Sequence, residues 1–300
     1  MSQRPDISII GCGKVGTTIA QLAARAGRRV AAVASRNEQA ARSAAEAIGR
    51  PSAVLSIAEA AGVGALVLLT VKDEAIEPLC SQLAQQGAFG RGAVVGHCCG
   101  ALSSEILASA RDRCGCTTGS MHPLATFPDA AAAIEGFPGT YCFCEGQDPA
   151  LGVLEQLASD LGGQSVRIDS AGKMLYHAAA VMACNYLTAL LDAAAVLCQG
   201  AGIDRHTALT ALKPLVAATL ENATKLGPAN ALTGPAARGD LETVRRHLQA
   251  IKKHPDTRGL QDFYRVAGQW TLQLAVRSGK LDNEAAGALR RVLEIHHPKE

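Results

Sequence analysis

The chain has 300 residues, of which 48% are hydrophobic and only 3% aromatic, and its formal net charge is +2. This length fits one large or two ordinary domains, which can bury about three quarters of the unfolded chain's surface. The basic residues are scattered, with no Lys/Arg stripe interleaved with aromatic residues, which excludes a typical nucleic-acid-binding protein. The ten cysteines give no CxxC pairs, so we expect reduced thiols and predict no metal site.

The sequence also predicts a cytoplasmic protein that has no membrane partner. The first strand-like segment begins at Ile7, which leaves no room for a signal peptide before it. We expect no apolar run of the roughly 18 residues that a membrane span needs.

A glycine-rich turn follows the first apolar run, ISII at residues 7–10, and leads into an alanine-rich helical pattern that stops at Gly27. In a strand, turn and helix of this kind, the first glycine permits the tight turn, the second lets the backbone approach a pyrophosphate, and the third allows close helix–strand packing. The free N–H groups of the helix then face the anion. We predict a dinucleotide site, with a purely structural tight turn as the alternative. The turn consists of Gly11, Cys12, Gly13, Lys14, Val15 and Gly16.

The end of the second expected strand, at about 29–34, bears on the choice of cofactor. An NAD site usually has an acidic residue there that binds the ribose 2′-OH. This chain instead has Ser35, Arg36 and Asn37, with no acid before Glu38. Arg36 can pair with a 2′-phosphate and stack on adenine, while Ser35 and Asn37 can donate to phosphate oxygens. We therefore predict NADP(H); an exposed arginine that caps the next helix is the alternative.

Strand-like and helical segments then alternate. We expect helices at about 38–48, 57–61, 73–86 and 103–110, the last capped by Ser103, and strands at about 53–54, 65–71 and 93–97. The alternation predicts an α/β fold with a doubly wound, mostly parallel Rossmann sheet. The ligand of such a sheet lies beyond the carboxyl ends of its strands, so we predict that Thr70, Val71 and His97 also contact the cofactor.

The pattern changes after residue 117. Strands are expected at about 119–124, 140–144 and 165–168 and a helix at about 149–161, which extend the sheet. After Ser170 only helical patterns follow, broken at about 200–204, 227–240 and 254–257. We predict two domains, an NADP-binding Rossmann domain of residues 1–169 and an all-α domain of residues 170–300.

Three residues are candidates for acid–base chemistry. Lys173 and His177 lie about 40° apart on one face of the first helix of the helical domain, where they can polarise or protonate a carbonyl or imine. His122 precedes Pro123, so its backbone is expected to be extended and its imidazole can point out of a loop at the strand ends. The alternatives are a solvated lysine and histidines that make structural hydrogen bonds.

The stretch LTGPAARGD at 232–240 is unusual in a helical domain. Arg238 can clamp a substrate carboxylate or phosphate. We favour a structural role, in which Asp240 caps the helix expected at 241–251 and pairs with Arg238.

Four segments together resemble a known family. GCGKVG, GSMHPLATF, KMLYHAAAVMACNYL and LTGPAARGD look like segments of Rossmann-like proteins that carry a C-terminal domain of unknown function, DUF2520. That family is grouped with F420-dependent NADP oxidoreductase-like and pyrroline-5-carboxylate-reductase-like proteins, in the 6-phosphogluconate-dehydrogenase-like superfamily. The resemblance covers nearly the whole chain.

The resemblance implies an NAD(P)-binding domain followed by a helical domain that often forms a dimer interface. The superfamily's β-hydroxyacid dehydrogenases carry a lysine on the first helix of the second domain, which Lys173 matches. Their asparagine four residues later is replaced here by His177. GSMHPL is similar to a segment of prephenate dehydrogenases whose histidine faces the substrate, which implies the same for His122.

Two classes of function remain open. The first is an NADP(H)-dependent oxidoreductase that transfers a hydride between the nicotinamide and a small carbonyl, imine or hydroxy-acid substrate held between the domains. The second is a non-catalytic NADP-binding sensor or regulatory dimer. In either case we expect a homodimer formed through the helical domain.

Overall fold

The computed structural model describes residues 4–49 and 51–295. The chain divides into two compact units, Met1–Met182 and Ala183–Glu300. The first unit holds the sheet and also the helix that starts at Lys173, which the sequence assigns to the second domain.

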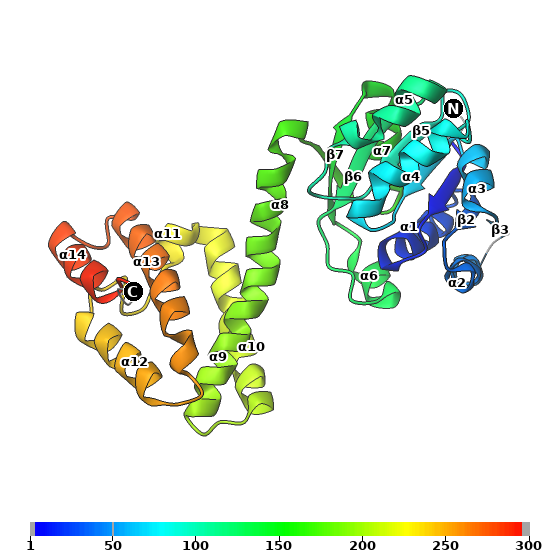
Figure 1. Cartoon of the computed structure of the whole chain (residues 1–300). Coiled ribbons are helices and arrows are strands. Elements are labelled where there is room, and N and C mark those ends of the chain that lie inside the picture. The colour runs from blue at the N-terminus through cyan, green and yellow to red at the C-terminus, as the bar shows by residue number, and fades with distance from the viewer. Residues whose placement is uncertain (1–3, 50, 296–300) are drawn as a thin grey trace, which may run out of the picture. The chain divides into compact units, whose positions relative to one another are not determined.

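The first unit is built on one eight-stranded sheet (Figure 1). The strands are β1 (Ile7–Ile10), β2 (Val30–Ala34), β3 (Ala53–Val54), β4 (Leu66–Leu69), β5 (Val94–His97), β6 (Thr117–Pro123), β7 (Tyr141–Gly146) and β8 (Gln164–Arg167). Their order is β3-β2-β1-β4-β5-β6-β7-β8, and only the β6–β7 pair is antiparallel. The predicted α/β class with a doubly wound, mostly parallel sheet is confirmed.

Two apolar cores cover the two faces of the sheet. The helices are α1 (Lys14–Arg25), α2 (Glu38–Ile48), α3 (Ile57–Val63), α4 (Asp73–Gln85), α5 (Ala108–Cys114), α6 (Ala130–Gly136) and α7 (Asp148–Asp160). Successive side chains on a strand point to opposite faces, so Ile9 belongs to one core and Ile10 to the other. Helices α1, α2, α6 and α7 contribute to the first core, and α3, α4 and α5 to the second (Figure 1).

The segment after β5 corrects the cap predicted at Ser103. A 3₁₀ turn (Ser104–Leu107) precedes α5, and the Ser103 side chain makes no capping hydrogen bond. The backbone N–H of Ser104 instead donates to Glu145 Oε1 over 2.8 Å. A carboxylate from another strand thus satisfies a first-turn amide, so Ser103 is not needed as the cap.

The helical run Ser170–Gly200 corrects another expectation. It contains α8 (Lys173–Val181), a π-helical turn (Met182–Tyr186) and α9 (Leu187–Gly200). An 18-residue window within it has a mean hydropathy of 1.7 and is only 11% buried. By length and composition this helix could cross a membrane, contrary to the expectation that no apolar run is long enough. Such a helix does not by itself identify a membrane protein, because an apolar helix face can also pack on another protein chain.

The described residues of the second unit form helices and connecting segments, with no strand among them. Its remaining helices are α10 (Arg205–Leu226), α11 (Pro228–Ala231), α12 (Leu241–Lys253), α13 (Gln261–Arg277) and α14 (Asn283–Val292). A small core joins α12, α13 and α14 around Leu248, Leu272 and Leu289. Asp240 caps α12 as predicted, accepting from the N–H of Thr243 over 3.0 Å. The predicted ion pair between Arg238 and Asp240 is absent from the described part of the chain.

Candidate active site

The glycine turn is built as the sequence predicts. A Cβ on Gly11, whose φ is +113°, would lie 2.6 Å from the backbone of Thr70, and one on Gly16 would lie 2.1 Å from the carbonyl oxygen of Gly11. Both positions therefore require glycine. Thr70 Oγ1 donates to the carbonyl of Gly11 over 2.7 Å, which ties the turn to the end of β4. A Cβ on Gly13 would meet nothing within 4 Å, so that side of the turn is open to a ligand.

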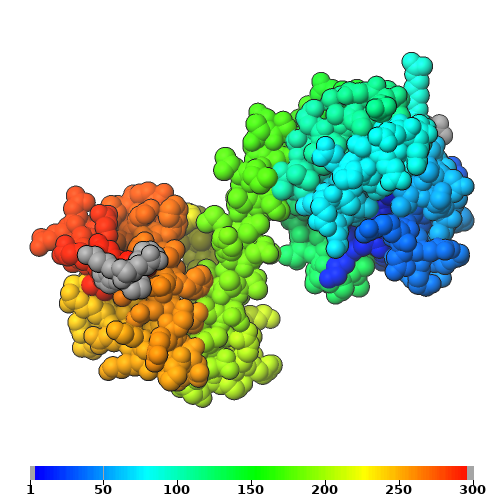
Figure 2. Space-filling view, in the orientation of Figure 1, coloured from blue at the N-terminus to red at the C-terminus, as the bar shows by residue number. Residues whose placement is uncertain are grey.

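A cavity of about 890 Å³ opens beside this turn. Figure 2 shows the dark blue start of the chain recessed beside the cyan segment that contains α4. The cavity reaches from the turn to α4, where Leu79, Gln82 and Gln86 line it. The predicted cofactor residues that line it are Gly11, Cys12, Gly13, Ser35, Arg36, Thr70 and Val71, whereas Lys14, Val15, Gly16, Asn37 and His97 do not.

Arg36 is free to meet a ligand. Asn37, not Arg36, caps α2, because its side chain accepts from the N–H of Ala40 over 3.3 Å. Ser35 Oγ accepts from the N–H of Asn37, so Ser35 and Asn37 shape the turn. Arg36 makes no ion pair with any residue that the structure describes, and it lines the cavity. The alternative reading of Arg36 as a helix cap is therefore wrong.

His97 has a different role from the one predicted. Its side chain is fully buried, Nε2 lies 3.2 Å from the carbonyl of Ser103, and Nδ1 accepts from the N–H of Cys99 over 3.1 Å. Burial, together with the charge of Lys173, lowers the pKa of His97 to about 4, so the ring is neutral at pH 7. Both ring nitrogens hold the loop after β5, and neither is left for a cofactor.

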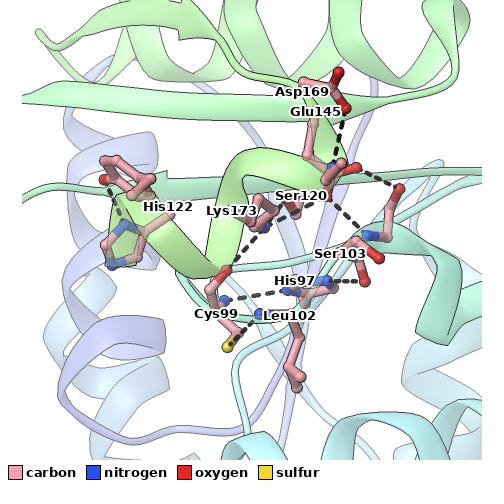
Figure 3. Close-up of polar contacts among 12 residues, drawn as sticks. His97, Cys99, Leu102, Ser103, Ser120, His122, Glu145, Asp169 and Lys173 are labelled. Atoms are coloured by element: carbon pink, nitrogen blue, oxygen red, sulfur yellow. Dashed lines mark hydrogen bonds and ion pairs between the residues drawn. The ribbon is translucent and has the colours of Figure 1, made fainter. Parts of the chain in front are cut away.

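Lys173 is buried and anchors the start of α8 to the sheet (Figure 3). Its Nζ donates to the carbonyl of Cys99 over 3.1 Å, to Ser120 Oγ over 2.5 Å and to Glu145 Oε1 over 3.4 Å. An ammonium group has three N–H donors, so these contacts use all of them. The lysine is therefore neither solvated, as the alternative reading held, nor directed at an open site.

Glu145 is the counter-charge that sequence reasoning missed. Its carboxylate accepts from Ser120 Oγ over 2.6 Å and from Ser104 Oγ over 2.9 Å, in addition to Lys173. Burial opposes ionisation, but the hydrogen bond from Ser120 and the charge of Lys173 hold the pKa of Glu145 below its ordinary value. The available signal was the acid in the otherwise apolar strand YCFCEG, because a carboxylate buried in a sheet needs a partner.

His122, Tyr176 and His177 form a second cluster. His122 Nδ1 and Tyr176 Oη share a hydrogen bond of 2.8 Å, and the His122 and His177 ring centroids lie 6.0 Å apart. Tyr176 packs on Phe143 with a centroid distance of 4.3 Å. A Cβ on Gly100 would lie 2.8 Å from both imidazoles, so the loop after β5 touches this cluster. Tyr176 was not among the residues predicted from the sequence, although it lies about one helical turn after Lys173.

The family comparison assigns the two parts of the chain. Residues 1–123 match the model of a Rossmann-like domain, and residues 140–271 match that of a domain of unknown function, DUF2520. The chain joins a Rossmann-like domain to a DUF2520 domain. The resemblance inferred from the sequence is thus confirmed. The His122–Tyr176 and Ser120–Lys173 hydrogen bonds each connect the Rossmann-like domain to the DUF2520 domain.

Solved structures share this fold. A protein described as an NADP oxidoreductase from Bacteroides fragilis is 24% identical, with 90% of this chain and 98% of that chain covered and a TM-score of 0.72. A reductive aminase from Aspergillus terreus in complex with NADPH and ethyl levulinate is 17% identical, with 96% of this chain and 99% of that chain covered and a TM-score of 0.69. An imine reductase variant from Myxococcus stipitatus in complex with NAD⁺ is 17% identical, with 97% of this chain and 100% of that chain covered and a TM-score of 0.64. At these identities the likeness establishes the fold. No curated protein matches the sequence.

Proposed function

We propose that this protein binds NADP(H) at the glycine turn and transfers a hydride between the nicotinamide and a small carbonyl, imine or hydroxy-acid substrate. The observation that carries the proposal is the cavity beside the turn, which is open at Gly13 and lined by Arg36, a side chain that pairs with none of the described residues. The first amides of α1 suit a pyrophosphate, and the guanidinium suits a 2′-phosphate. When bound, NADP(H) supplies or accepts the hydride.

The structural neighbours support the oxidoreductase class. Those named above are described as an NADP oxidoreductase, a reductive aminase and an imine reductase, and the last two hold a nicotinamide cofactor. His122 and His177 are candidates for moving the proton that accompanies the hydride, and Lys173 acts as a positioning residue because its donors are occupied. A protein that binds NADPH but turns over no substrate would instead be a sensor.

We further propose that the protein is a cytoplasmic homodimer formed through the helical domain. Helix α10 exposes Leu209, Leu215 and Leu220, the last two at 62% each. Exposed apolar residues at this density are typical of association surfaces.

The test is cofactor titration of the wild type and of Arg36→Glu, followed by turnover assays. We expect NADPH to bind more tightly than NADH. Arg36→Glu should lower the affinity for NADPH by about 100-fold, since repulsion between the carboxylate and the 2′-phosphate replaces the charge-assisted hydrogen bonds. Arg42→Glu is the matched control, because Arg42 is an exposed arginine on α2 that pairs with Glu38. Unchanged NADPH affinity in Arg36→Glu would overturn the cofactor assignment.

Turnover is followed at the nicotinamide absorbance with a panel of ketones, keto acids and cyclic imines. Reduction of any member supports the oxidoreductase. NADPH binding without turnover on the whole panel would favour the sensor.

A further inference from the structure

We propose that Tyr176 is the catalytic acid of the reaction and that His122 positions its phenol and restores its proton. This inference rests on the proposed function and adds a residue to it. Three observations support it: the position of the Tyr176–His122 pair at the sheet edge, the protonation states of the two side chains, and the hydrogen bonds that occupy all donors of Lys173.

The pair lies at the edge of the sheet where the glycine turn lies. β1, β4, β5 and β6 are parallel neighbours, so their carboxyl ends share one edge. The glycine turn leaves the end of β1, and His122 stands near the end of β6. The loop between them in space, which follows β5, touches both imidazoles at Gly100. Ligands of open parallel sheets bind at this edge, so a nicotinamide and its substrate would meet the pair there.

Both side chains are in the form that the role needs. Burial raises the pKa of Tyr176 to about 12, so the phenol keeps its proton at pH 7. Burial, with smaller contributions from His177 and Lys173, lowers the pKa of His122 to about 4, so its imidazole is neutral. A neutral imidazole can donate from Nδ1 to Tyr176 Oη and accept at Nε2. The phenolic proton is then free to point to a substrate.

Lys173, the obvious alternative acid, has no free proton to give. Its three N–H donors go to Cys99, Ser120 and Glu145, and its side chain is only 1% exposed. It fixes the first turn of α8, on which Tyr176 follows three residues later. The lysine therefore places the tyrosine without reaching the substrate.

In the reductive direction, the hydride supplied by NADPH forms the new C–H bond at the carbonyl or imine carbon. The electron pair of the double bond moves onto the oxygen or nitrogen. Tyr176 Oη transfers its proton to that atom, so NADPH is oxidised and the substrate reduced. His122 returns a proton from Nδ1 to the phenolate while its Nε2 takes one up. His177, which is partly exposed and lies next to His122, can exchange protons with water.

The experiment compares Tyr176→Phe with a matched control, Tyr264→Phe. Tyr264 Oη makes the same contact in the second unit, 2.8 Å from His247 Nδ1, with the rings also edge to face. We expect Tyr176→Phe to lower kcat by about 100-fold or more, the usual contribution of a general acid. The affinity for NADPH should change less than about two-fold. The phenyl ring keeps the contact with Phe143, so folding is retained. Tyr264→Phe should leave kcat unchanged.

The second readout needs neither cofactor nor turnover. In ¹H–¹⁵N spectra of the imidazoles of the cofactor-free protein at pH 7, we expect His122 to be neutral and protonated at Nδ1. Tyr176→Phe should shift that Nδ1 resonance, and Tyr264→Phe should not.

The outcomes separate this inference from the proposed function. If the wild type turns over and Tyr176→Phe keeps more than about a third of kcat, Tyr176 is not the acid, but the oxidoreductase stands. A His122 that is charged, or protonated only at Nε2, also overturns the inference. If the wild type reduces no member of the panel, both proposals fall, and NADPH binding then decides whether the nucleotide site remains.

Discussion

The two units bury polar groups to very different extents. Of the ten polar or charged residues that are buried within the described ranges, nine lie in the first unit and only Thr257 lies in the second. Exposed large apolar residues show the opposite bias, since eleven of seventeen lie in the second and shorter unit. The first unit thus uses its interior to hold charged and hydrogen-bonded side chains in fixed places, while the second leaves apolar surface uncovered.

This difference agrees with the proposal that the first unit carries the reaction and the second unit forms the dimer. A buried ion pair such as Lys173–Glu145 adds little stability over apolar packing, and its value here is that it fixes α8 against β6 and β7. Uncovered leucines on α10 add nothing to the stability of a monomer, and the dimer proposed above would cover them.

The largest effect is expected from Lys173→Met. The change leaves the carboxylate of Glu145, only 4% exposed, without its cation, and it removes the donor to Ser120. Breaking one partner of a buried pair costs about 3–5 kcal/mol of unfolding free energy. Urea unfolding followed by circular dichroism measures the loss, and hydrogen exchange locates it in β6 and β7. The double variant Lys173→Met/Glu145→Gln should recover a large part of the lost unfolding free energy, because it no longer buries an unpaired carboxylate.

The second unit supplies the control for this prediction. Lys225 and Glu221 form an exposed pair on α10, with side chains 68% and 62% exposed. Lys225→Met should cost less than about 0.5 kcal/mol. Equal losses from Lys173→Met and Lys225→Met would show that burial does not distinguish the two pairs.

The next effect concerns the glycine turn. Gly16→Ala places a Cβ 2.1 Å from the Gly11 carbonyl and should cost roughly 2–3 kcal/mol of stability through overpacking. Gly13→Ala meets nothing within 4 Å and has an ordinary φ of −80°, so the fold should tolerate it. It should nevertheless lower the affinity for NADPH about 10-fold or more, because the added methyl group keeps the phosphates away from the backbone. Calorimetric titration and thermal unfolding separate the two effects, and a Gly13→Ala variant with full affinity would place the cofactor elsewhere.

The sequence predicts the sheet well because the signals there are local. The runs at 7–10 and 66–69 are buried throughout and apolar except for Ser8, and a strand buried on both faces has that composition. The glycine turn and the cap at Asp240 also follow from neighbouring residues. These elements needed no knowledge of distant contacts.

The candidate site is less predictable because its contacts join distant residues. The positions Lys173 and Glu145 are separated by 28 residues, and His122 and Tyr176 by 54. The spacing of residues in the sequence does not show which side chains meet across strands. Lys173 could therefore be chosen as a functional residue, but the hydrogen bonds that use all three of its N–H donors could not be foreseen. His97 was misassigned for a different reason: its partners Ser103 and Cys99 are close in sequence, but they lie on a loop whose path the sequence does not specify.

The association surface proposed for the second unit gives a smaller effect. Leu215→Glu with Leu220→Glu places two charges at exposed positions of α10. We expect the dimer dissociation constant to rise roughly 10- to 100-fold, measured by light scattering across a dilution series. Gln39→Glu with Gln85→Glu adds the same two charges to exposed positions of the first unit and should leave the dimer intact. A dimer unaffected by the leucine changes would move the interface away from α10.

The smallest effect is the pH dependence that buried histidines impose on the first unit. Burial holds the pKa of His122, and likewise that of His97, at about 4, below the ordinary 6.5. Between pH 6.5 and 4 the unfolded chain binds protons on these rings that the folded chain does not, so stability is present above this window and falls as the pH is lowered through it. His122→Asn should therefore reduce the stability difference between about pH 7 and pH 5 by roughly 1 kcal/mol. His206→Asn, the same change at an exposed position of α10, is the control. If His122→Asn leaves the slope as steep as in the wild type, the ring is charged in the folded protein, and Tyr176 then lacks the neutral partner that its role requires.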